Sequence, residues 1–200
     1  MTGVQTSALP ISNEAGFLSP HGNLLVDVET ASVTGLNLQV SRVLANNLLA
    51  HLDGLPSTRT SRALFDKTIA VTASNDEWKE SVFDLKELLA GQRGIYRLRA
   101  AATNEAWVAD ECVVSITDIA LTAKLERDGV VILATSLRSA QPIDGVQITA
   151  VSPNNQALGT VATDANGIAR MPFDPKHPDG LPFVLVAMKN DDASYLKLDD

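Results

Sequence analysis

Short alternating segments separated by turn residues follow one another from Ile119 to the C-terminus. Alternation of apolar and polar residues is typical of half-buried strands. About seven such segments in about eighty residues is the count and spacing expected of an immunoglobulin-like sandwich. No helical pattern separates them, so a parallel α/β sheet is disfavoured. The expected strands are residues 119–125, 130–137, 146–152, 158–163, 168–173, 183–189 and 194–198, and the expected core residues are Leu121, Ile132, Ile148, Phe173 and Leu185.

The stretch from Thr163 to Arg170 predicts a strand end, a tight turn and the start of the next strand. Asn166 and Gly167 tolerate positive φ, which the favoured hairpin turns need. The Asp164 carboxylate can accept hydrogen bonds from the turn backbone. We therefore expect a β-hairpin here.

Residues 23–118 predict a looser sandwich of the same type, with two short helical turns inserted. Asn46 and Asn47 can cap one turn and Asp84 the other, the latter in a capping box with Glu87. The segment 94–100 alternates cleanly, and 108–116 is its expected hairpin partner. With a boundary at Thr117-Asp118, the fold class is all-β, with two tandem immunoglobulin-like domains at residues 23–118 and 119–200.

Residues 1–22 show neither strand nor helix periodicity, and we expect a disordered or foreign leader there. The first twelve residues lack the basic and continuous apolar regions of a signal peptide. The apolar runs in the chain are far shorter than the ~20 residues that a membrane span needs. We therefore expect no membrane span.

The net charge of −8 and the isoelectric point of about 4.8 argue against a nucleic-acid or anionic-membrane partner, since both need a cationic face. Cys112 is the only cysteine, so no intrachain disulfide and no thiolate cluster can form. It alternates with polar neighbours, and we expect a buried, inert thiol.

No motif in the chain indicates catalysis or a cofactor. There is no G-x-S-x-G elbow, no P-loop and no dinucleotide glycine fingerprint. His21, His51 and His177 are scattered without metal-ligand spacing. We therefore expect no enzyme, no catalytic, cofactor-binding or metal-binding residues, and no cofactor.

For each of three groups of residues the sequence allows two interpretations. Arg59 and Arg62, on an expected polar loop, could bind an anion or simply be solvated. Acidic residues near strand ends could share a calcium ion, or serve turn formation and solubility. Trp78 and Trp107 are expected in the core or between domains rather than on an exposed sugar-binding platform. The acidic residues in question are Asp128, Asp164, Asp191, Asp192, Asp199 and Asp200.

Several runs, taken in order, resemble the N-terminal macroglobulin domains of bacterial alpha-2-macroglobulins. In the second half they are Val114-Ser115-Ile116-Thr117-Asp118-Ile119-Ala120-Leu121-Thr122-Ala123-Lys124, Val131-Ile132-Leu133-Ala134-Thr135-Ser136-Leu137, Gln141-Pro142-Ile143-Asp144-Gly145-Val146 and the Thr163–Ala169 turn. Upstream they are Leu38-Gln39-Val40-Ser41-Arg42-Val43, Asn46-Asn47-Leu48, Phe83-Asp84-Leu85 and Gly94-Ile95-Tyr96-Arg97-Leu98. The resemblance covers nearly all of the chain after about residue 23, and it assigns residues 119–200 to an MG2-type domain.

The resemblance implies a part of a large periplasmic or cell-surface protein that traps proteases. Family members offer a bait segment, and many capture the protease through a Cys-x-Glu-Gln thioester. Here Cys112 is followed by Val113-Val114-Ser115, and no bait-like segment is present. The resemblance therefore implies a non-catalytic scaffold whose partners are neighbouring macroglobulin domains of the same chain and, for the full-length protein, target proteases.

A stand-alone extracellular adhesion or binding module is the alternative, because bacterial immunoglobulin-like adhesin repeats carry similar turns. Adhesin repeats resemble one another, whereas residues 23–118 do not repeat residues 119–200.

Overall fold

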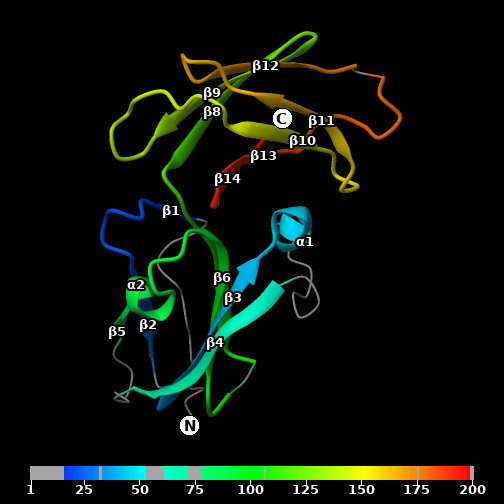
Figure 1. The fold of residues 1–200 in the computed structure, drawn as a ribbon. Helices are drawn as coiled ribbons and strands as arrows, with labels where there is room; N and C mark the ends of the chain where they lie inside the picture. Colours follow the sequence, from blue (N-terminus) through cyan, green and yellow to red (C-terminus); the bar gives the residue numbers. More distant parts are fainter. Residues whose placement is uncertain are drawn as a thin grey trace.

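The computed structural model describes residues 16–31, 33–52, 61–71, 78–105, 107–174 and 176–198. It is built almost entirely of strands, which form one group of sheets before Thr117 and another after Asp118 (Figure 1). We call these the first half and the second half. The expected all-β class, with two tandem immunoglobulin-like sandwiches, is confirmed.

A five-stranded sheet in the order β1-β7-β6-β3-β4 forms the main layer of the first half. Strands β2 and β5 pair as a second, smaller layer. Apolar side chains from the two layers fill the core between them, with Leu36, Tyr96 and Leu98 fully buried. The strands are β1 (Gly16–Leu18), β2 (Leu25–Thr30), β3 (Gly35–Val43), β4 (Ser61–Ala70), β5 (Lys79–Asp84), β6 (Gly94–Ala102) and β7 (Ala109–Ile116).

The hairpin of β6 and β7 forms as the alternation predicts. The two strands pair antiparallel, with Leu98 opposite Cys112. Tyr96 and Leu98 point into the core, while Arg97 and Arg99 are partly exposed.

Two short helical turns interrupt the first half. The Asp84 carboxylate accepts a hydrogen bond from the Lys86 amide at 2.7 Å, so the expected cap at the start of α2 (Leu85–Leu88) is confirmed. The other turn consists of η1 (Ala45–Asn47) and α1 (Leu48–Leu52). The N-cap residue of η1 is Leu44, which makes no side-chain cap, so Asn46 and Asn47 lie within the 3-10 turn that leads into α1.

Two sheets face each other in the second half, in the orders β11-β10-β13-β14 and β12-β9-β8. Among the expected core residues Ile132, Ile148 and Leu185 are fully buried, and Leu121 and Phe173 pack partly buried against them. The strands are β8 (Ile119–Glu126), β9 (Gly129–Ser136), β10 (Gln147–Val151), β11 (Ala157–Ala162), β12 (Ile168–Pro172), β13 (Val184–Lys189) and β14 (Asp192–Lys197).

The turn from Thr163 to Ile168 does not form the expected hairpin. β11 and β12 belong to different sheets, so the turn carries the chain from one layer of the sandwich to the other. The turn chemistry itself is as expected. The Asp164 carboxylate accepts hydrogen bonds from the Asn166 and Ile168 amides, each at 2.9 Å, and Gly167 has a φ of +72°.

Three further expectations for the first half need correction. Residues 16–18 were expected in a leader, but they form β1, which pairs parallel with β7. Arg62 was expected in a loop and lies instead in β4, which pairs with β3 along the full length of that strand. β5 was not expected at all. Residues 19–22 of the expected leader lie in the turn after β1, and residues 1–15 lie outside the described part of the chain, as does Arg59.

Candidate functional site: the junction of the two halves

An apolar contact joins the two halves. Leu48 and Leu49 of α1, with Val43 of β3 and Ile95 of β6, pack against the second half. Their partners there are Val184 and Val186 of β13 and Tyr195 of β14, all buried. Figure 1 shows α1 between the large sheet of the first half and the sheet that contains β10 and β13.

The sequence of β13 explains why it can lie at this contact. Val184 and Val186 face the first half, whereas Leu185 and Ala187 face the core of the second half. Alternate residues of a strand point to opposite faces, so a strand with both faces buried is apolar at successive positions. The run from Val184 to Ala187 is therefore the sequence signal of an interface on the outer face of this sheet.

Asp192, at the start of β14, ties three parts of the chain together. Its Oδ2 accepts a hydrogen bond from Nη1 of Arg93 at 2.7 Å and another from the Asp118 amide at 3.0 Å. The Asp192 side chain is 6% exposed and that of Arg93 is 32% exposed. An ion pair of this kind keeps more of its strength than one in open solvent, because water screens it less.

The connection between the halves is itself fixed by hydrogen bonds on both sides. The Thr117 amide donates to the Leu18 carbonyl of β1 at 3.1 Å. The Asp118 carboxylate accepts from the Ser136 hydroxyl at 2.9 Å and from the Arg138 amide at 3.0 Å. Nearby, the Ser115 hydroxyl donates to the Ala193 carbonyl at 3.1 Å.

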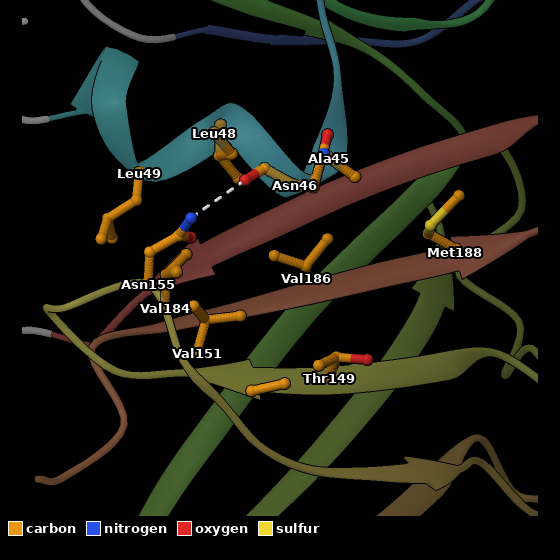
Figure 2. A pocket seen from close by; sticks show the side chains of 11 residues that line it. Ala45, Asn46, Leu48, Leu49, Thr149, Val151, Asn155, Val184, Val186 and Met188 are labelled. Atoms are coloured by element: carbon orange, nitrogen blue, oxygen red, sulfur yellow. Dashed lines mark hydrogen bonds between the residues drawn. The ribbon is translucent and has the colours of Figure 1, made fainter. Parts of the chain in front are cut away.

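A pocket of about 270 Å³ opens beside the apolar contact (Figure 2). Ala45, Leu48 and Leu49 form its wall in the first half, and residues of β10 and β13 form the opposite wall. Asn155 donates from Nδ2 to the Asn46 carbonyl at 3.2 Å, which adds a polar contact between the halves at this point. The pocket walls are mainly aliphatic and carry no titratable group.

Cys112 lies near the junction but is partly buried rather than fully buried. Burial, followed by the charges of Asp110 and Glu111, raises the pKa of its thiol from 9.0 to about 11. The thiol is therefore protonated at neutral pH and is a weak nucleophile. Burial also raises the pKa of Tyr195, with a smaller effect from Cys112.

The residues considered for metal binding do not come together. Over the described ranges, no group of three or more His, Cys, Asp and Glu side chains could hold a metal ion. His51 is buried, His21 is exposed, and Nδ1 of His177 accepts a hydrogen bond from the Asp179 amide at 3.2 Å. Asp192 binds Arg93, and Asp199 and Asp200 lie outside the described residues.

The expectation for the tryptophans is wrong. Trp78 is 55% exposed and Trp107 is 79% exposed. Trp107 lies in the connection between β6 and β7, and Trp78 directly precedes β5, so both sit where a strand begins or ends rather than on its inward face. The average burial of tryptophan does not identify such positions.

The junction residues were missed or misread in the sequence. Asp192 was read as a member of an acidic pair at a strand end, and Arg93 carried no signal. The two residues are far apart in sequence, and no local pattern predicts that they will pair.

The described part of the chain contains no helix that is long and apolar enough to cross a membrane.

Comparisons with known proteins show what this chain is similar to. Residues 116–200 match the family model of the bacterial alpha-2-macroglobulin MG3 domain, whereas the sequence-based assignment is to an MG2-type domain. An alpha-2-macroglobulin homolog of Yersinia pestis is 23% identical over 224 residues. That match covers 94% of this chain and 11% of the relative, so the chain spans about a ninth of the relative's length.

Solved structures of alpha-2-macroglobulins share the fold. The crystal structure of the native Escherichia coli protein spanning domains NIE-MG1 has a TM-score of 0.77 and 16% identity, and the match covers 98% of this chain and 99% of that one. For Salmonella alpha-2-macroglobulin reacted with methylamine the TM-score is 0.71 at 16% identity, with 96% of this chain and 12% of that chain covered. The predicted resemblance is therefore confirmed: residues 116–200 match a bacterial alpha-2-macroglobulin MG3 domain, and the chain as a whole is similar in sequence and fold to bacterial alpha-2-macroglobulins.

Proposed function

We propose that this chain is a non-catalytic scaffold portion of a bacterial alpha-2-macroglobulin-like protease inhibitor. The observation that carries the proposal is the junction itself. Two sandwiches meet through a buried apolar contact, and both halves together match the E. coli NIE-MG1 structure over 98% of the chain. A fixed pair of domains of this kind suits a part that shapes a larger molecule without reacting.

The chemistry of the described side chains supports a role without catalysis. The Cys112 thiol, with a pKa of about 11, has little thiolate at neutral pH. The pocket at the junction offers amide and hydroxyl groups but no acid or base. A site for acid–base or nucleophilic catalysis needs such groups within hydrogen-bond reach of one another.

The partners follow from the same proposal. Neighbouring macroglobulin domains of the same chain are the direct partners, and target proteases are partners of the full-length protein. Its location is the periplasm or the cell surface, as expected from the family resemblance.

The test compares this chain with the product of the complete reading frame that contains it. Each protein is incubated with a protease such as trypsin, and cleavage of a large protein substrate and of a small peptide substrate is measured. We expect the complete product to protect the large substrate while small-peptide cleavage continues, because trapping excludes only bulky substrates. The 200-residue chain alone should protect neither.

Two results would overturn the proposal. One is inhibition of small-peptide cleavage by the chain alone, which would indicate a direct active-site inhibitor. The other is a complete reading frame that encodes no further macroglobulin domains, which would favour a stand-alone binding or adhesion module.

A further inference from the structure

The two oxygens of Asp192 differ in their surroundings. Oδ2 accepts from Arg93 of the first half and from the Asp118 amide at the junction. Oδ1 is buried and has no hydrogen-bond partner. A buried carboxylate is costly unless it is paired, so Asp192 depends on the first half to supply its counterion.

Asp118 is held in turn by the second half. Its carboxylate binds Ser136 and the Arg138 amide, and its carbonyl accepts from the Leu137 amide at 2.8 Å. Arg93 immediately precedes β6, so its backbone is fixed by the large sheet of the first half. The Arg93–Asp192 ion pair therefore joins the two halves directly, near the point where the chain crosses between them.

We propose that Arg93, Asp118 and Asp192 form a junction lock that holds the two halves in a single orientation. When the lock is closed, the halves move as one body and the apolar contact around α1 stays buried. When Arg93 is removed, the contact loses its charged anchor and opens more often. This inference concerns the 200-residue chain itself and does not rest on the proposed role in protease trapping.

The apolar contact and the lock are connected by strand β13, so one cannot open without the other. The lock lies at the β13–β14 turn, and Val184 and Val186, at the other end of β13, pack against α1. Rotation of one half about Thr117-Asp118 would separate Arg93 from Asp192 and would expose these valines together. Opening is therefore a concerted event, and weakening the lock should change both the hydrogen bonds of Asp192 and the relative orientation of the two halves.

The test uses Arg93→Met, which removes the cation and leaves the Asp118 and Asp192 side chains in place. Hydrogen exchange of the Asp118 amide reports the state of the lock, because this amide donates to the same Asp192 oxygen as Arg93. We expect it to exchange about tenfold faster in the variant, a discounted value because Arg93 is partly exposed to solvent. Core amides, such as those of Leu98 and Ile148, should keep their wild-type rates.

Matched variants separate the lock from general loss of stability. Asp191→Asn changes the net charge by the same amount in the opposite direction, at the exposed residue next to Asp192, and should leave exchange of the Asp118 amide unchanged. Arg93→Lys keeps a cation and should restore part of the protection. Small-angle X-ray scattering should show a broader distance distribution for Arg93→Met than for Asp191→Asn.

The proposal is overturned if the Asp118 amide of Arg93→Met exchanges at the wild-type rate, or if scattering gives the wild-type distance distribution. It is equally overturned if core amides and the Asp118 amide accelerate together, because Arg93 would then support the fold of the first half rather than the orientation of the two halves. Neither result would bear on protease trapping, which is measured separately on the complete product.

Discussion

The aromatic rings of Phe17 and Tyr195 lie 5.2 Å apart, centroid to centroid, at an interplanar angle of 47°. Phe17 belongs to β1 and Tyr195 to β14, so the rings join the first described strand to the last. Tilted aromatic pairs at this distance add stabilisation beyond the area that they bury. The segment that the sequence analysis assigned to a leader therefore contributes to the junction.

Replacement of Phe17 by alanine should lower the free energy of unfolding by about 1 kcal/mol, because an aromatic pair and the buried part of a ring that is 42% exposed are lost. Urea unfolding followed by circular dichroism measures the change. Trp107→Ala is the control: that side chain is 79% exposed, and its loss should change stability by less than about 0.5 kcal/mol. Equal effects of the two substitutions would show that β1 does not support the fold.

Replacement of Gly167 by alanine should destabilise the second half by about 3 kcal/mol, from a strained backbone and a steric clash together. Gly167 has a φ of +72°, and an added Cβ would lie 2.5 Å from the Ala134 carbonyl oxygen. Gly145→Ala separates the two causes, since Gly145 has a φ of +66° and nothing within 4 Å of an added Cβ. That control should cost only about 1 kcal/mol, and thermal unfolding of both variants tests the difference.

The thiol of Cys112 should react slowly with Ellman's reagent in the folded chain at pH 8, because only the thiolate attacks and its pKa is about 11. The rate should rise as the pH approaches 11, and it should be high at pH 8 once urea unfolds the chain. Fast reaction of the folded chain at pH 8 would contradict the raised pKa.

The raised pKa of Cys112 also makes the stability of the fold depend on pH. A raised pKa in the folded state means that the contribution of Cys112 is complete below pH 9.0 and is lost as the pH rises toward about 11. Cys112→Ala should therefore lose less stability over this interval than the wild type, as measured by urea unfolding at several pH values. Burial also raises the pKa values of Tyr96 and Tyr195, so the Cys112→Ala variant should still lose some stability as the pH rises.

The pKa of the Asp164 carboxyl should lie below 3.8, first because the Ile168 amide donates to it and then because Asn166 does. A lowered pKa means that its contribution to stability is present above pH 3.8 and is lost as the pH falls through the folded-state value. The amide chemical shifts of Asn166 and Ile168 should titrate together with a midpoint below 3.8. A midpoint at or above that value would contradict the turn geometry.

The exposed tryptophans give a spectroscopic test of the corrected first half. Trp78 and Trp107 should emit at wavelengths typical of hydrated indole, and acrylamide should quench the folded chain almost as efficiently as the unfolded one. Trp78→Phe and Trp107→Phe assign the signal to each residue. A blue-shifted emission protected from acrylamide would show that the rings are buried.

Local patterns predicted the strands well where burial is one-sided. The alternation of Tyr96, Arg97, Leu98 and Arg99 shows directly in the sequence, because each side chain faces either the core or the solvent. The capping role of Asp84 was also readable, since it depends on residues within one turn. These features require no knowledge of distant parts of the chain.

Pairing between distant segments could not be predicted in the same way. The residues from Asp164 to Gly167 form the same turn whether the next strand pairs with the previous one or crosses to another sheet, so the hairpin was a reasonable but wrong prediction. The apolar run in β13 indicates that both faces are buried but not that α1 covers one of them. The pairing of Arg93 with Asp192 depends on the completed fold and leaves no local trace.

The crossing from β11 to β12 also sets how the second half can fold. Closing this turn forms no strand ladder between the strands that it connects, because β11 pairs with β10 and β12 pairs with β9. Part of the strand pairing therefore forms only after segments that are distant along the chain have met. The chain loses the entropy of closing those loops before the contacts between the strands form. Sandwiches with such non-local pairing refold in about milliseconds to seconds, and stopped-flow refolding of this chain should fall in that range rather than in microseconds.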